Sequence, residues 1–135
     1  MKDRVFIDTS AFFAIMVESD KNHKTALEIF DRISLNYSPC TGEPVLSETF
    51  TLLKRKFGIY AAIEFGNIIL PSTHLNIFYI DGDIFDKSWG IFIKYKDQDF
   101  SFVDCLSFAI LKKENINKVF SFDKHFNYMG YKMNF

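Results

Sequence analysis

Two acidic residues stand directly after short apolar runs that have the length of buried strands. Asp8 follows residues 5–7, and Asp123 follows residues 119–122. In a parallel sheet the carboxyl ends of the strands lie along one edge, and ligands bind beyond that edge. Asp is also a frequent turn and helix-capping residue, so local structure is a competing explanation for each acid alone. Their shared placement is nevertheless the first indication of a functional site.

Asp104 lies in a segment, residues 101–111, whose apolar residues surround the helix that we expect it to form. At about 100° per residue, Asp104 shares a stripe with Phe108 and Leu111. A carboxylate on an apolar face needs a partner because an unpaired buried charge is costly, and a cation would provide that partner. The competing interpretation is a capping box, in which Ser101 and an acid three residues later cap the helix.

Glu48 belongs to a helix with a clear apolar stripe formed by Leu46, Phe50, Leu53 and Phe57. On a helical wheel Glu48 lies roughly 200° from Leu46, opposite that stripe. Periodicity therefore favours a solvated acid. Its place early in the helix also suits a carboxylate, because the helix dipole stabilises negative charge there.

Taken together, the four acids would have the ligand chemistry of a Mg²⁺ or Mn²⁺ site. These ions prefer carboxylate and water oxygens to sulfur or imidazole. Bound at such a site, they lower the pKa of water and neutralise charge on a phosphoryl group. Acids that converge at one edge of a sheet would therefore serve the cleavage of a phosphodiester.

The elements that must position these acids alternate between strands and helices. Strands are expected at residues 5–7, 37–40, 75–80 and 119–122, with a weaker fifth strand at 131–135. Helices are expected at residues 11–17, 20–33, 44–57, 59–70, 83–96 and 101–114, with Asp20, Asp83 and Ser101 as caps. This alternation implies crossover connections and a parallel sheet covered on both faces, so the predicted class is α/β.

Composition narrows the possible functions. The 135 residues carry 16 Lys and Arg against 17 Asp and Glu, a formal charge of −1. The length predicts one domain over residues 1–135. The charge excludes binding of nucleic acid by bulk electrostatics, although not by a local basic patch. The chain has two cysteines, no apolar start typical of a signal peptide and no run near the ~18 residues of a membrane span, so we expect a cytoplasmic protein.

Four motifs in this order resemble the PIN domain, and within it the VapC-type toxins of bacterial and archaeal toxin–antitoxin pairs. The motifs are VFIDTSAF at residues 5–12, VLSET at 45–49, DQDFSFVDC at 97–105 and VFSFDKHF at 119–126. The resemblance covers essentially the whole chain. It implies a single PIN-like domain with three α/β/α layers around a mostly parallel sheet of about five strands.

The resemblance also implies a metal-dependent endoribonuclease that cleaves single-stranded RNA with Mg²⁺ or Mn²⁺. According to this resemblance, the catalytic, metal-binding acids would be Asp8, Glu48, Asp104 and Asp123. Glu48 would then be a metal ligand, although helical periodicity alone favours a solvated acid. Thr9, Ser10 and Ser121 would carry hydroxyls that orient the carboxylates. Asp97 and Asp99 fall where further acids occur in the family, although capping explains Asp99 equally well.

The same resemblance implies partners. The substrate would be RNA, and phosphate contacts are expected from seven residues, several of which also suit the solvated ends of helices: Lys54, Arg55, Lys56, Lys112, Lys113, Lys124 and His125. A homodimer and a small antitoxin that inserts into the active-site groove are further expectations, and no membrane is expected.

Two alternatives remain at this point. One is a DNA-directed or structure-specific nuclease that uses the same acids. The other is a PIN scaffold that binds RNA or protein without cleaving it. The presence of all four acids favours the enzyme over the binding module.

Overall fold

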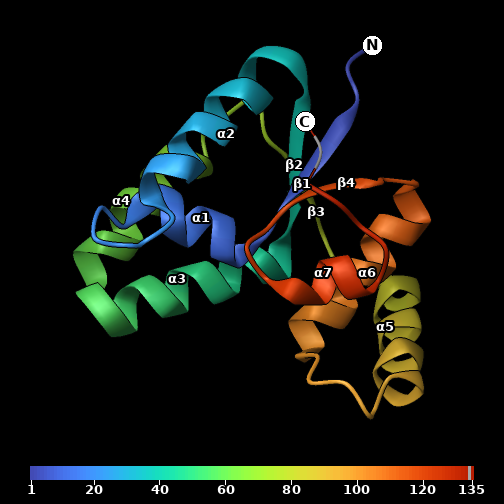
Figure 1. The fold of residues 1–135 in the computed structure, drawn as a ribbon. Coiled ribbons are helices and arrows are strands. Elements are labelled where there is room, and N and C mark those ends of the chain that lie inside the picture. Colours follow the sequence, from blue (N-terminus) through green and yellow to red (C-terminus); the bar gives the residue numbers. More distant parts are fainter. Residues whose placement is uncertain (134) are drawn as a thin grey trace.

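The computed structural model describes residues 1–133 and 135 as a parallel sheet with helices on both sides (Figure 1). The four strands are β1 (Arg4–Ile7), β2 (Ser38–Gly42), β3 (Asn76–Phe78) and β4 (Lys118–Phe120). They are ordered β3-β2-β1-β4, and every pairing is parallel. Because β1 lies next to β4, the residues that follow these two strands meet at one edge of the sheet.

The described residues form seven helices: α1 (Thr9–Met16), α2 (His23–Asn36), α3 (Glu43–Phe57), α4 (Ile59–Ile69), α5 (Gly82–Lys94), α6 (Phe102–Glu114) and α7 (Lys124–Tyr128). In Figure 1, α1 to α4 gather on one side of the strands and α5 to α7 on the other. The expected α/β class is therefore confirmed. Within the described part of the chain, no helix has both the length and the apolar character needed to cross a membrane.

Phenylalanine side chains fill the layers on both sides of the sheet. On the side of α1 to α4, Phe65 packs edge-on against Phe12 and Phe50, with ring centres 5.3 and 5.6 Å apart. On the side of α6 and α7, Phe108 packs in the same way against Phe100 and Phe126, at 5.1 and 5.2 Å. Such edge-to-face pairs add stabilisation beyond the burial of their area.

Helix α6 approaches the sheet closely at the end of β2. A Cβ atom on Gly42 would lie 2.9 Å from Cδ1 of Ile110 and 3.7 Å from the ring of Phe6. A larger residue here would require Cδ1, the tip of the Ile110 side chain, to shift. Helix α6, which carries Asp104 in its first turn, therefore packs closely on the strands.

The expectation of about five strands is wrong for the described part of the chain. Lys132 forms a single parallel bridge with Lys118, and among residues 1–133 and 135 no ladder extends it. Asn134 lies outside the described residues. Strand β4 has only three residues, so a strand added at this edge would form few hydrogen bonds.

Two expected helix caps are also wrong. Asp81, not Asp83, caps α5, because its Oδ1 accepts the backbone N–H of Ile84 at 2.9 Å. Asp20 accepts the N–H of Asn22 at 2.8 Å in the turn that precedes α2. Acidic residues are favoured at the cap and in the first turn alike, so the pattern cannot separate these neighbouring positions.

Candidate active site

Asp8 follows β1 directly and is buried, with 4% of its surface exposed. Its Oδ2 accepts hydrogen bonds from the hydroxyls of Ser121 at 3.0 Å and Ser10 at 3.3 Å. The backbone N–H of Phe122 donates to the Ser10 hydroxyl, and that of Asp123 donates to the Ser121 hydroxyl, both at 2.9 Å. The chain segments after β1 and β4 are thus joined around the Asp8 carboxylate.

Burial raises the pKa of Asp8 from 3.8 to about 7. The backbone N–H of Thr9 and the Ser121 hydroxyl oppose this shift, whereas the negative charges of Asp104 and Glu48 add to it. Among the described residues, no lysine, arginine or histidine forms an ion pair with Asp8. Asp8 is therefore a buried acid whose full ionisation at neutral pH needs a cation.

Asp104 is buried in the first turn of α6 and makes two kinds of contact. It forms a capping box with Ser101, in which the Asp104 N–H donates to the Ser101 hydroxyl and the Ser101 N–H donates to Asp104 Oδ2, both at 3.0 Å. The same Oδ2 lies 3.0 Å from Nδ1 of His125. Burial raises the pKa of Asp104, while the Ser101 N–H and His125 oppose the rise. The capping interpretation is confirmed, and it is compatible with a place in the site.

Asp123 and His125 lie beside Asp104. Asp123 caps α7, since its Oδ1 accepts the backbone N–H of His125 at 3.0 Å, and the same oxygen lies 3.3 Å from Nδ1 of that histidine. Ligand atoms of Asp104, Asp123 and His125 all lie within 4.8 Å of one another. The sequence pattern suggested that His125 contacts RNA, but its ring turns inward to the acids. In the sequence, the only feature that indicates this position is the place of His125 two residues after Asp123, which caps α7.

One oxygen of each aspartate is left for a ligand. The hydrogen bonds of Asp8 and Asp104 use Oδ2, and those of Asp123 use Oδ1. Among the described residues, every side-chain polar atom that is closed off from solvent has a partner, so the other carboxylate oxygens are not fully closed off from solvent. Carboxylate oxygens that lie close together fit a hard divalent cation.

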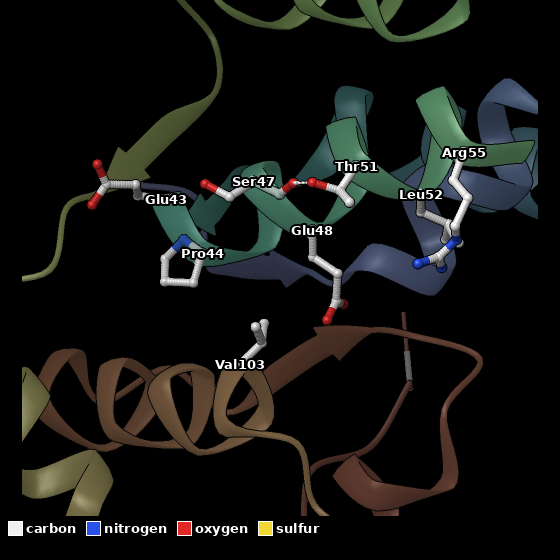
Figure 2. Close-up of a pocket in the computed structure, with 8 residues that line it drawn as sticks. All are labelled: Glu43, Pro44, Ser47, Glu48, Thr51, Leu52, Arg55 and Val103. Atoms are coloured by element: carbon white, nitrogen blue, oxygen red, sulfur yellow. Dashed lines mark hydrogen bonds between the residues drawn. The ribbon is translucent and has the colours of Figure 1, made fainter. Parts of the chain in front are cut away.

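Glu48 lies half-buried on α3, beside a groove of about 680 Å³ between α3 and the start of α6. Figure 2 shows its side chain extending from α3 into the groove, which Val103, the residue that precedes Asp104, lines from the α6 side. Arg55, about two turns further along the same face of α3, lines the same groove. Glu48 is also close enough to Asp8 to raise the pKa of that acid.

The helical wheel misplaced Glu48 because the buried stripe of α3 is rotated from the expected one. The buried residues are Val45, Leu46, Thr49 and Leu53, whereas Phe57, expected inside, is 53% exposed. Glu48 lies about 60° around the helix from Val45, the nearest residue of this stripe, at 100° per residue. It therefore occupies the border between the core and the groove.

A family model described as the PIN domain matches residues 5–130, a range that contains all four acids. The chain belongs to the PIN-domain family. The resemblance found in the sequence motifs is thereby confirmed.

The PIN domain has a relative of similar length in Mycobacterium tuberculosis, the 23S rRNA-specific endonuclease VapC20. The two are 32% identical over 127 residues, which cover 94% of this chain and 95% of VapC20. The crystal structure of VapC20, described as a Sarcin-Ricin loop cleaving toxin, superimposes with a TM-score of 0.88 at 30% identity and covers 96% of this chain and 98% of VapC20.

More distant structures share the fold of this PIN domain. VapBC2 from Rickettsia felis, solved bound to a DNA fragment from its promoter, has a TM-score of 0.69 at 12% identity over 93% of this chain and 92% of its own. A toxin–antitoxin complex from Klebsiella pneumoniae has a TM-score of 0.62 at 17% identity over 89% and 87%.

Some predicted site residues of the PIN domain lie away from the acids or face elsewhere. The Thr9 hydroxyl donates to the carbonyl of Val45 at 3.5 Å and not to a carboxylate. Asp97 and Asp99 are exposed between α5 and α6, and neither belongs to the group of metal-ligating side chains found among the described residues. Ser10 and Ser121, in contrast, both contact Asp8.

The lysine and arginine residues expected to bind RNA are all exposed: Lys54, Arg55, Lys56, Lys112, Lys113 and Lys124. They are not gathered in one place on the PIN domain. Lys113 lies about 14 Å along α6 from Asp104, at 1.5 Å per residue, and pairs with Asp81 at 3.3 Å. Arg55 in the groove is the basic residue that shares a surface with Glu48.

Proposed function

We propose that this chain is a metal-dependent endoribonuclease that cleaves single-stranded RNA, formed by a single PIN domain over residues 1–135, and that it is the toxin of a toxin–antitoxin pair. One observation carries the proposal. Asp104 and Asp123 lie together at the carboxyl edge of the sheet, with Asp8 close enough to feel the charges of Asp104 and Glu48, in a chain 32% identical along 94% of its length to a 23S rRNA-specific endonuclease.

The proposed metal ligands are Asp8, Glu48, Asp104 and Asp123, holding Mg²⁺ or Mn²⁺. When bound, such an ion lowers the pKa of water and stabilises charge on a phosphoryl group. The protein supplies the positioning. Ser10 and Ser121 hold one oxygen of Asp8, which leaves its other oxygen as the proposed metal ligand.

The exposed basic residues support binding of an RNA backbone. Arg55 in the groove, together with Lys54 and Lys56 on the same turn of α3, would bind phosphates close to the acids. Lys124 follows Asp123 directly and is exposed on the other side of the site. Lys112 and Lys113, at the far end of α6, would bind RNA that extends beyond the cleaved bond.

The proposed partners are a small antitoxin and a second copy of the chain. Solved complexes that share this fold are toxin–antitoxin assemblies. Large apolar side chains are exposed on two helices, Tyr60 and Ile63 on α4 and Phe85 and Trp89 on α5, and partners of this kind would cover them. Because the proposed substrate is cellular RNA, we propose the cytoplasm as the compartment.

Purified protein incubated with 23S rRNA tests this function. We expect Mn²⁺- or Mg²⁺-dependent cleavage, mapped by primer extension, that EDTA abolishes and that Asp104→Asn lowers by about 10²–10³-fold. Asp97→Asn is the matched control, because Asp97 is an exposed acid seven residues earlier in the chain, and it should leave the rate unchanged.

Three results would overturn the proposal. Undiminished cleavage in EDTA would remove the metal from the reaction. RNA binding without cleavage under every metal condition would identify a binding module. Cleavage of duplex DNA with RNA left intact would instead favour the DNA-directed alternative.

A further inference from the structure

We infer that His125 is itself a ligand of the bound metal, and that its nitrogen makes this site select a transition-metal ion of the Mn²⁺ type over Mg²⁺. The inference rests on the metal-dependent site proposed above and adds a residue that the four-acid set does not contain. It starts from the Asp104, Asp123 and His125 group.

The ring of His125 is fixed in place from three directions. Its backbone N–H donates to Asp123 Oδ1 at 3.0 Å, which holds the first turn of α7 against that carboxylate. The ring packs edge-on against the buried ring of Phe100, with centres 5.2 Å apart and planes at 73°. Its Nδ1 reaches Asp104 Oδ2. The side chain is only 19% exposed, so it is part of the site wall and not a mobile surface group.

The spacing of the three donor atoms suits a shared ion. Nδ1 lies 3.0 Å from Asp104 Oδ2 and 3.3 Å from Asp123 Oδ1. Neighbouring ligands of an octahedral ion with bonds of about 2.1 Å are about 3 Å apart, the length of an octahedron edge. One ion can therefore contact Nδ1 and one oxygen of each carboxylate after small movements of the side chains, in place of the contacts that His125 Nδ1 now makes with the two acids.

Donor chemistry gives this group its selectivity. Mg²⁺ is bound through carboxylates, phosphates and water, and it gives up water reluctantly. An imidazole nitrogen suits first-row transition ions better. A site in which one imidazole joins the carboxylates should therefore gain affinity for Mn²⁺ from the nitrogen and gain little for Mg²⁺. The rival interpretation is that His125 only orients the two carboxylates by hydrogen bonds.

Electron spin echo spectroscopy of the Mn²⁺-loaded protein separates the two interpretations, because it detects nitrogen atoms bonded directly to Mn²⁺. The chain has three histidines, and ¹⁵N-histidine labelling assigns such a signal to histidine. His125→Asn keeps a hydrogen-bond donor near the Nδ1 position, and His125→Phe keeps the ring that packs on Phe100. His74→Asn is the control, since His74 is exposed.

We expect a directly bonded histidine nitrogen in the unmodified protein and in His74→Asn, and its loss in both His125 variants. In the variants the Mn²⁺ affinity, measured by calorimetry, should fall about tenfold or more, while the Mg²⁺ affinity should change less than about threefold. Bound Mn²⁺ without a histidine nitrogen, or equal losses for the two ions, would overturn the inference. If RNA is still cleaved in that case, the proposed function stands; absence of any Mn²⁺ or Mg²⁺ binding would overturn both.

Discussion

The two sides of the acidic site neutralise their carboxylates by different means. On the β1 side, Asp8 accepts from the neutral hydroxyls of Ser10 and Ser121 and is also stabilised by the backbone N–H of Thr9. On the α6 side, Asp104 has a backbone N–H from its capping box and, in addition, the ring of His125. Asp8 has no such ring among the described residues, and burial raises its pKa to about 7.

This difference shows which side depends on a cation. Helix caps and an imidazole compensate the charge of Asp104, so part of its position is secured by the fold alone. Asp8 has no imidazole partner among the described residues, and its charge is costly whenever the site holds no metal. We therefore expect the α6 side to position the metal site and the β1 side to respond most strongly to its occupation.

The largest expected effect of this difference is on stability as a function of pH. Without metal, folded Asp8 keeps a proton up to about pH 7, whereas the unfolded chain releases it near 3.8. The folded state binds more protons in this window, so the free energy of unfolding should fall as pH rises from about 4 to about 7, by about 4 kcal/mol. Asp104, whose pKa is also raised, adds to the fall. Urea unfolding in EDTA across this range measures it.

Asp8→Asn is the control for that measurement. The variant should lose most of the fall and should be more stable than the unmodified protein at pH 8. Addition of Mn²⁺ at pH 8 should raise the stability of the unmodified protein but raise that of Asp8→Asn less. A free energy of unfolding that rises between pH 4 and 7 without metal would show that Asp8 is already compensated.

A smaller effect is expected from removal of one hydroxyl on the β1 side. Ser121→Ala deletes the donor to Asp8 Oδ2, and hydrogen bonds to charged groups contribute about 1.5–3 kcal/mol. The loss of stability should therefore be larger at pH 8, where Asp8 is ionised, than at pH 5. Ser88→Ala, which removes a buried hydroxyl that donates to the Ile84 carbonyl at 2.7 Å, should cost the same at both pH values. Equal pH dependence in the two variants would contradict the difference between the two sides.

Much of the fold could be predicted because its signals are local. The apolar run before Asp8 forms β1, and Ser101 with an acid three residues later forms the capping box of α6. The short helix α7 was missed, since it has five residues and little periodicity. The weak strand at the end of the chain was overestimated, because a bridge at Lys132 depends on the partner strand and not on its own sequence.

The site was predicted less completely, because its geometry depends on tertiary packing. Helical periodicity located Glu48 on the solvated face, and only the rotation of α3 in the fold brings it to the groove. The inward turn of His125 depends on Asp104, which is 21 residues away in sequence. Spacing along the chain does not predict that contact. The family motifs identify the four acids, whereas the contact of His125 with Asp104 is seen only in the structure.

The cation at the acids is tested most directly by crystals grown with Mn²⁺ and measured at the manganese absorption edge. We expect an anomalous peak within about 2.5 Å of carboxylate oxygens from both sides of the site, Asp8 on one and Asp104 on the other. A peak that contacts neither aspartate would contradict a metal site formed by these residues. The absence of any peak at saturating Mn²⁺, in crystals in which Asp8 keeps its contacts with Ser10 and Ser121, would contradict it as well.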